Sequence, residues 1–223
     1  MTKKQELYTS IDQNCCSTRA DHLKSFLDKL VHFEKAPASS KLSYHHAWEG
    51  GLIGHIMEMI GFGLPYTYDM NLKHLKINTQ ELVTVCVLHD ICKVGDSSGN
   101  PFYVPNILKS GKVSDKIPFE IEKLARLHCD LADDRLQTGD SEVQYLFNRF
   151  CKNNLEHGEM SLALVYTLAP ELYDSLTPDE HQAVEFHDGA YGKAKYSLGG
   201  KECPLQIVAH CIDMLSSRSS DNE

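Results

Sequence analysis

Apolar residues along this chain recur mainly at steps of three and four positions, which is the period of an amphipathic α-helix. One such stripe follows a polar start near Asp21, and others cover 52–60, 121–131 and 143–150. The stretch from Thr79 to Lys93 is apolar on nearly all sides, so we expect this helix to run through the middle of the domain. The pattern therefore predicts an all-α fold, a compact helical bundle.

Local start signals indicate where individual helices begin. Asn78-x-x-Glu81 resembles a capping box, and Thr177-Pro178-Asp179-Glu180 places a capping Thr before Pro at the first helical position. We expect a last helix from about Pro204 to Ser217, followed by a polar tail, 218–223, that is frayed.

Two segments rich in Gly, Pro and Ser, 94–118 and 188–204, interrupt the helical pattern, and both directly follow histidine-bearing helices. The first contains Phe102-Tyr103-Val104 and the turn Lys109-Ser110-Gly111-Lys112, which predict either a long loop or a small hairpin. No linker is long enough to divide the chain, so we expect a single domain over residues 1–223.

Composition excludes several classes of function. The chain carries 22 Lys and Arg against 31 Asp and Glu, a net charge of −9, with no basic segment, so broad nucleic-acid or anionic-membrane binding is not expected. Its longest apolar tracts are shorter than the roughly 20 residues of a membrane-spanning helix. Eight cysteines without a CxxC pair, and an N-terminus without an apolar leader, predict a reduced, cytoplasmic protein.

Histidine is the unusual component, with twelve residues beside a single tryptophan, and it is the commonest metal ligand in proteins. His89 and Asp90 stand inside the apolar stretch, where burying an imidazole and a carboxylate without a partner is costly. Taken alone, such a pair is more often a hydrogen-bonded core histidine beside a helix-terminal aspartate. The motifs around the pair therefore decide between a structural pair and a pair of metal ligands.

The motifs around this pair resemble, in their order, those of the HD-domain metal-dependent phosphohydrolase superfamily, two-metal type. YHHAWEGGLIGH at 44–55 is similar to the family's first motif, and LHDICK at 88–93 to its central HDxxK motif. LEHGEMS at 155–161 and AVEFHDG at 183–189 look like the additional histidine motifs, and VAHCIDMLS at 208–216 resembles the closing one. The resemblance covers about 42–218 and implies an HD-domain helical bundle. The metal ligands that it implies are His55, His89, Asp90, His157, His187 and Asp213.

Four imidazoles and two carboxylates, with water in the remaining positions, suit two octahedral Mn, Fe, Co or Mg ions better than a closed tetrahedral zinc site. We expect Asp90 to bridge the ions, because its carboxylate offers two oxygens. Two ions about 3.5 to 4 Å apart can activate a hydroxide and stabilise the attacking and leaving oxygens of a phosphate ester. Lys93, one helical turn beyond His89, is expected to act with Asp90 in catalysis by neutralising phosphoryl charge.

Further candidates are expected at the rim of the site. His45 and His46 precede glycines that favour a bend, so substrate contact and surface placement both stay open. Tyr191 and Lys195 could stack on a base or bind a phosphate, or belong to a solvated loop. Two more histidines are expected either to orient ligands or to lie in the core: His128 and His210.

The chain departs from the family pattern in two places. Cys92 stands where the central motif commonly has Gly, and His187 is followed by Asp188-Gly189 where the HD-GYP phosphodiesterases have a His-His-Glu run. A cyclic dinucleotide substrate is therefore not expected.

Together, the resemblance and the ligand set predict an enzyme, a divalent-metal-dependent hydrolase of a small phosphate ester. The expected substrate is a nucleotide, and the activity is that of a phosphomonoesterase or phosphodiesterase. Two alternatives stay open: an HD-fold diiron oxygenase acting on a small diol or hydroxyphosphonate, and a nucleotide-binding regulatory module with a degenerate site. Lys93 favours hydrolysis over oxygenation.

Overall fold

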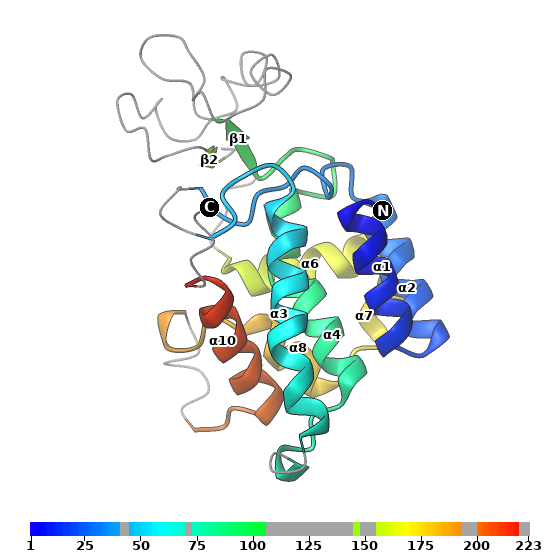
Figure 1. Cartoon of the computed structure of the whole chain (residues 1–223). Helices are drawn as coiled ribbons and strands as arrows, with labels where there is room; N and C mark the ends of the chain where they lie inside the picture. Colours follow the sequence, from blue (N-terminus) through cyan, green and yellow to red (C-terminus); the bar gives the residue numbers. More distant parts are fainter. Residues whose placement is uncertain (41–44, 70–72, 106–144, 148–154, 193–199, 219–223) are drawn as a thin grey trace.

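The structure, a computed structural model, describes residues 1–40, 45–69, 73–105, 145–147, 155–192 and 200–218. These residues form a helical bundle, which confirms the expected all-α class (Figure 1). The α-helices are α1 (Lys3–Asn14), α2 (Ser17–Lys29), α3 (Gly51–Tyr68), α4 (Thr79–Leu88), α6 (His157–Leu168), α7 (Pro170–Asp174), α8 (Pro178–Glu185) and α10 (Pro204–Ser216). The 3₁₀ turns are η1 (Lys73–Leu75), η2 (Ile91–Val94) and η4 (Gly189–Tyr191), and the strands are β1 (Tyr103–Pro105) and β2 (Tyr145–Phe147).

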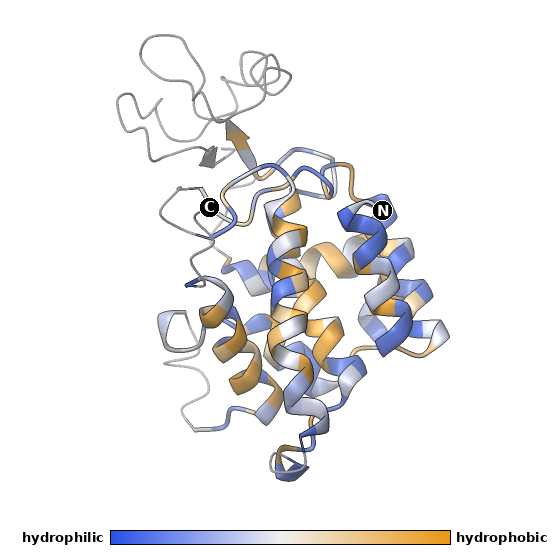
Figure 2. Cartoon of the chain, in the orientation of Figure 1, coloured by the Kyte–Doolittle hydropathy of each residue, from blue (hydrophilic) through white to orange (hydrophobic). Residues whose placement is uncertain are grey.

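Helix α4 lies inside the bundle, packed against α3, α8 and α10, while α1 and α2 form the side at the N-terminus (Figure 1). Every residue of α4 from Leu82 to Leu88 is buried, as its all-round apolar sequence predicts. Figure 2 shows this helix mainly in the colours of apolar residues, whereas α1 and α2 carry many hydrophilic ones. One apolar cluster extends from Leu7 in α1 to Ile212 in α10, so the described helices share a core.

Two predicted helix starts are confirmed. The Asn78 side chain accepts hydrogen bonds from the backbone N–H groups of Gln80 at 2.8 Å and Glu81 at 3.4 Å. At α8, Thr177 Oγ1 accepts from the Glu180 N–H at 3.2 Å, and the Glu180 carboxylate accepts from the Thr177 N–H at 2.7 Å. Both bonds of a capping box are therefore present at Thr177, whereas Asn78 caps α4 through its own side chain without the reciprocal bond to the Glu81 carboxylate.

The continuous helix predicted over 79–93 is wrong. Helix α4 ends at Leu88, and η2 begins only after Asp90, whose φ of −116° and ψ of 15° depart from helical values. Ser161 Oγ from α6 donates to the His89 carbonyl at 3.0 Å and accepts from the Cys92 N–H at 3.2 Å. The helix is interrupted where a side chain from another helix satisfies its backbone groups, a contact that the local pattern does not contain.

Beyond η2, the short strand β1 forms at Tyr103–Pro105, where a long loop or a small hairpin with a turn at 109–112 was expected. Its partner among the described residues is the antiparallel strand β2, with Tyr103 opposite Phe147. The helix predicted over 143–150 is therefore wrong at 145–147, where pairing with β1 and a bond from the Tyr145 N–H to the Ser40 carbonyl at 3.2 Å override the helical period.

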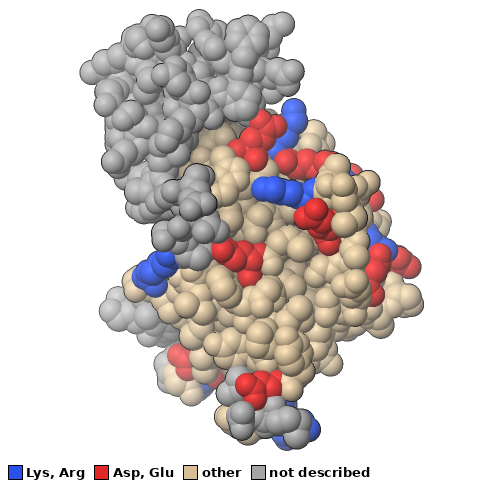
Figure 3. Space-filling view, viewed as in Figure 1, with Lys and Arg blue, Asp and Glu red and all other residues tan. Residues whose placement is uncertain are grey.

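Several expectations lie outside the described residues: the helix over 121–131, the turn at 109–112 and the tail after 218. Within the described ranges, no helix combines the length and hydropathy that crossing a bilayer requires. On the face shown in Figure 3, Lys and Arg side chains are interspersed with Asp and Glu, and the surface over α3 and α10 is largely uncharged.

Candidate metal centre

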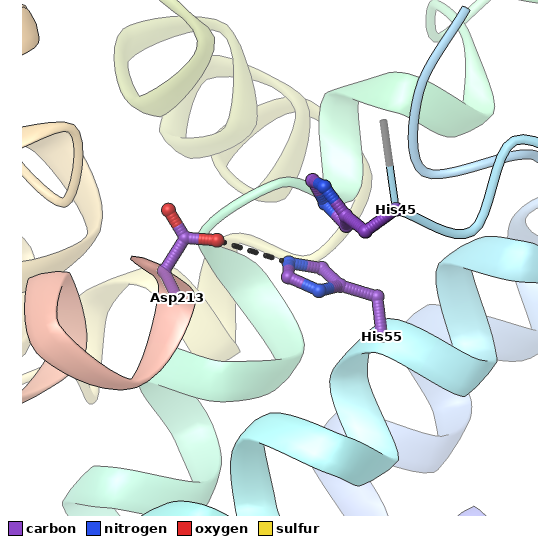
Figure 4. Close-up of side chains that lie close together, drawn as sticks. All are labelled: His45, His55 and Asp213. Carbon is purple, nitrogen blue, oxygen red and sulfur yellow. Dashed lines mark ion pairs between the residues drawn. The ribbon is translucent and has the colours of Figure 1, made fainter. Parts of the chain in front are cut away.

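A cluster of histidine and aspartate side chains lies where α3, α10 and the end of α4 meet. The Nε2 atom of the fully buried His55 is 3.1 Å from His89 Nε2. The same atom is 3.2 Å from Asp213 Oδ1 (Figure 4). His89 Nε2 is in turn 3.4 Å from Asp90 Oδ2. Side chains that are far apart in the sequence therefore converge on one point.

Both imidazoles present a lone pair to this point. His89 Nδ1 lies 2.9 Å from the Cys86 carbonyl oxygen, which can only accept, so the proton is on Nδ1 and Nε2 is free to act as a ligand. Ser216 Oγ donates to Glu58 Oε2 at 2.5 Å, so it accepts from His55 Nδ1 at 2.8 Å. Burial lowers the pKa of His55 to about 4 and keeps its ring neutral near pH 7.

These donors fit a divalent cation. Two lone pairs that face each other repel, and a cation between them removes the repulsion. Two nitrogens bound side by side to one octahedral ion, each at about 2.1 Å, are about 3 Å apart, and the two Nε2 atoms are separated by 3.1 Å. Asp90 Oδ1 is also buried without a hydrogen bond from any described residue, which leaves a carboxylate oxygen for a further ligand bond.

With its second oxygen, Asp90 faces another set of imidazoles. Oδ1 is 3.6 Å from His187 Nε2 and 3.9 Å from His157 Nδ1, whereas Oδ2 faces His89. His187 Nδ1 lies 2.9 Å from the Val184 carbonyl, so this ring is oriented in the same way as that of His89. The carboxylate thus lies between two groups of histidines, the placement that a bridging ligand requires.

At Asp90, His187 and Asp213, interactions with neighbouring groups outweigh the effect of burial. Burial alone would raise the pKa of Asp90, but Lys93 and the surrounding histidines hold it well below its usual value. Burial would likewise lower the pKa of His187, but Asp90 raises it to about 9. Burial also raises the pKa of Asp213, an effect outweighed by its interaction with His55, so the net shift is downward. A cation bound at His187 would therefore displace a proton from this ring.

Lys93 does not follow His89 on one continuous helix, although the sequence predicts that it does. Because α4 ends earlier, Lys93 belongs to the 3₁₀ turn η2, and its Nζ is 2.5 Å from Asp90 Oδ2. Burial opposes the charge of this ammonium, but Asp90 outweighs burial and raises the Lys93 pKa above its ordinary value. The group therefore remains a buried positive charge next to the centre.

The glycines of the first motif produce the expected bend. Gly50 has a φ of +74°, α3 begins at Gly51, and a Cβ on Gly51 would lie only 2.0 Å from the His46 carbonyl oxygen. The turn brings the His45 ring to 4.5 Å from the His55 ring, and burial lowers the pKa of His45 to about 3. His46 instead places its Nε2 3.0 Å from Glu58 Oε2.

The other rim candidates are less closely associated with the cluster. Tyr191 is 77% exposed, and its ring is 6.1 Å from that of His210. His210 Nδ1 lies 2.8 Å from the His187 carbonyl, so it holds the backbone of a candidate ligand, one of the two roles expected for it. Lys195 and His128 lie outside the described residues.

Three residues that orient the candidate ligands were not identified from the sequence: Glu58, Ser161 and Ser216. Glu58 follows His55 by three positions, Ser216 follows Asp213 by three, and Ser161 follows His157 by four. Each therefore lies one helical turn from a candidate ligand. A polar residue at this spacing on a buried face is the signal that could have found them.

Fold and site together define a helical protein with a buried His/Asp cluster able to hold a metal ion, a combination compatible with an HD-like site. No family model, curated protein or solved structure matches the chain. Its function is therefore inferred from its own residues.

Proposed function

We propose that this chain is a divalent-metal-dependent hydrolase of phosphate esters, with a nucleotide as its substrate. The observation that carries the proposal is the position of Asp90, whose two carboxylate oxygens face two different groups of histidines. A carboxylate in this position can join two cations, and a pair of cations is a recurrent arrangement for phosphate-ester hydrolysis. The order of the HD-like motifs supports the same reaction.

The site has two halves, one around His55, His89 and Asp213 and one around His157 and His187. Asp90 Oδ2 faces the first half and Asp90 Oδ1 faces the second. Bound cations would supply Lewis acidity and lower the pKa of a water molecule. The side chains that would hold them are His55, His89 and Asp213 in the first half, and His157 and His187 in the second.

Lys93 supports hydrolysis over oxygen chemistry. Its buried ammonium next to Asp90 is a fixed positive charge where negative charge on phosphoryl oxygens would develop. In a site shielded from water, such a charge stabilises a transition state more strongly than it would in solution.

Space for the remainder of a substrate lies near the second half of the site. A cavity of about 180 Å³ is lined by residues that include Cys92, Asp96, Phe102 and Met160. The Phe102 ring is 5.8 Å from the His157 ring, so one wall of this cavity contacts a candidate ligand. An aromatic wall offers a surface on which a nucleobase can stack.

The proposal is tested by loading the purified full chain with Mn²⁺, Fe²⁺, Co²⁺ or Mg²⁺ and incubating it with a panel of nucleotides and other phosphate esters. We expect phosphate or nucleoside release that requires metal and is abolished by chelation. The His89→Ala variant is the matched negative control, because it removes one donor of the first half.

Two outcomes would contradict the proposal in different ways. Substrate-dependent oxygen uptake by an iron-loaded sample, without phosphate release, would indicate a diiron oxygenase. Less than about one bound metal per chain after reconstitution, unchanged in His89→Ala, would indicate a nucleotide-binding module with a degenerate site.

A further inference from the structure

We propose that His45 is a direct metal ligand that completes the first half of the centre, on the side of His55 and Asp213. This assignment replaces the two roles that the sequence left open for His45, substrate contact and surface placement, and it rests on the metal centre of the proposed function. One ring nitrogen each of His45 and His55 and a carboxylate oxygen of Asp213 all lie within 4.8 Å of one another. Figure 4 shows the His45 ring over that of His55, near the Asp213 carboxylate.

Hydrogen-bond accounting supports a ligand role for His45. Its Nε2 is buried and has no hydrogen-bond partner among the described residues. A buried imidazole nitrogen without a partner is unfavourable, and a metal bond at this ring would supply the missing interaction. The adjacent His46 also has a buried nitrogen without a described partner, Nδ1, but its Nε2 is hydrogen-bonded to Glu58. Its ring is 5.9 Å from that of His55, against 4.5 Å for His45, so His45 is the closer candidate.

The turn that carries His45 is held in place by the chain itself. The His45 carbonyl accepts a hydrogen bond from Ser39 Oγ at 2.6 Å, and the His46 carbonyl accepts one from the Ala38 N–H at 3.0 Å. The Gly50 N–H donates to the Lys35 carbonyl at 3.1 Å. The imidazole therefore approaches the centre from a prearranged backbone, which lowers the entropic cost of metal binding.

The proposed ligand also agrees with the coordination that an octahedral cation needs. His55, His89, Asp213 and one oxygen of Asp90 are four donors in the first half, and His45 would be a fifth. A single position would then remain for water or a substrate oxygen, which is compatible with a catalytic site.

The test uses Co²⁺ bound to the full chain and proton NMR, in which protons of cobalt-bound imidazoles have strongly shifted resonances. We compare wild type with His45→Ala and with the matched variant His46→Ala. We expect His45→Ala to lose one set of shifted imidazole signals and to bind Co²⁺ at least about 10-fold more weakly in competition with a chelator. His46→Ala should keep every set, whatever its affinity.

Circular dichroism and thermal melting of the metal-free variants identify any loss of fold. The assignment is overturned if folded His45→Ala keeps all shifted signals, including the case in which only its KM for substrate rises. Wild type that binds no Co²⁺ overturns it as well. Wild type that shows the His45 signals but hydrolyses no phosphate ester refutes the hydrolase and leaves the ligand assignment standing.

Discussion

Asp90 is the residue on which the two halves of the centre depend. Its Oδ2 faces His89 and is paired with the Lys93 ammonium, while Oδ1 faces His157 and His187. The histidines and the ammonium next to this carboxylate have opposite effects on the binding of a cation. Histidines add donors, whereas the ammonium adds only repulsion, so metal binding and charge stabilisation can be separated by substitution.

We therefore predict different effects for Asp90→Asn and Lys93→Met. Asp90→Asn should abolish metal retention and activity, because it removes the carboxylate shared by both halves. Lys93→Met should retain metal, since it removes repulsion but no donor, while kcat falls by about 100-fold through loss of phosphoryl charge stabilisation. Metal analysis and steady-state kinetics measure both effects.

A double variant controls for loss of fold. Asp90→Asn leaves the Lys93 ammonium buried without its partner, which should lower the free energy of unfolding by about 3 to 5 kcal/mol. Adding Lys93→Met should restore much of this stability in urea denaturation but none of the metal. Metal retention by the stable double variant would contradict the role given to Asp90.

Among the helices, the amphipathic periods and caps were sufficient to predict the bundle and most of its long members. They failed where contacts between distant segments decide the backbone. Ser161 stabilises the interruption after α4, and β1 directs Tyr145–Phe147 into a strand. Helix α1 was also missed, because its only buried apolar residues are Leu7 and Ile11, a weak periodic signal.

In the candidate site, too, the sequence predicted some residues and missed those whose role depends on contacts between distant segments. The order of the motifs identified His55, His89, Asp90, His187 and Asp213, side chains that the structure brings together. It did not identify Glu58 or Ser216, because neither occupies a ligand position of the motifs. Their importance comes from hydrogen bonds between distant residues, since Ser216 links His55 to Glu58. The position of Lys93 was also wrong, because it depends on the interruption of the helix.

The start of α6 is held close to the end of α8 by Gly158. A Cβ at this position would lie 2.3 Å from the Val184 carbonyl oxygen and 2.5 Å from that of Glu185. We predict that Gly158→Ala forces the helices apart, lowers the free energy of unfolding by about 2 kcal/mol and weakens metal binding at His157 and His187. Urea denaturation and chelator competition measure the two effects.

Gly61 provides the matched control inside α3, because a Cβ there would have no other atom within 4 Å. Gly61→Ala should raise the free energy of unfolding by about 0.5 to 1 kcal/mol through helix propensity and leave metal binding unchanged. Equal effects of the two substitutions would show that close packing at Gly158 is not important.

At the scale of the whole molecule, the first two helices belong to the same core as the HD-like segment, although the resemblance begins only near residue 42. Arg19 in α2 pairs with Glu180 in α8 at 2.9 Å, and both side chains are buried. The same guanidinium donates to the Ser175 carbonyl at 2.7 Å. A buried pair of this kind is sensitive to removal of one partner.

We predict that Arg19→Ala lowers the free energy of unfolding by about 3 to 5 kcal/mol, because Glu180 loses its counter-charge in the core. Lys24→Ala is the control, since it breaks the surface pair with Asp12 and should leave the urea midpoint unchanged. If Arg19→Ala unfolds at the wild-type midpoint, the buried pair between α2 and α8 does not contribute to the stability of the core.

The pairing of β1 with β2 has a consequence for how this protein can evolve. Pro105 lies opposite Tyr145, so the chain departs for 106–144 and returns at the same place. Insertions and deletions between these two points need not displace His89 or Asp90. Descendants of this sequence can therefore diversify that segment while inheriting the His/Asp cluster intact.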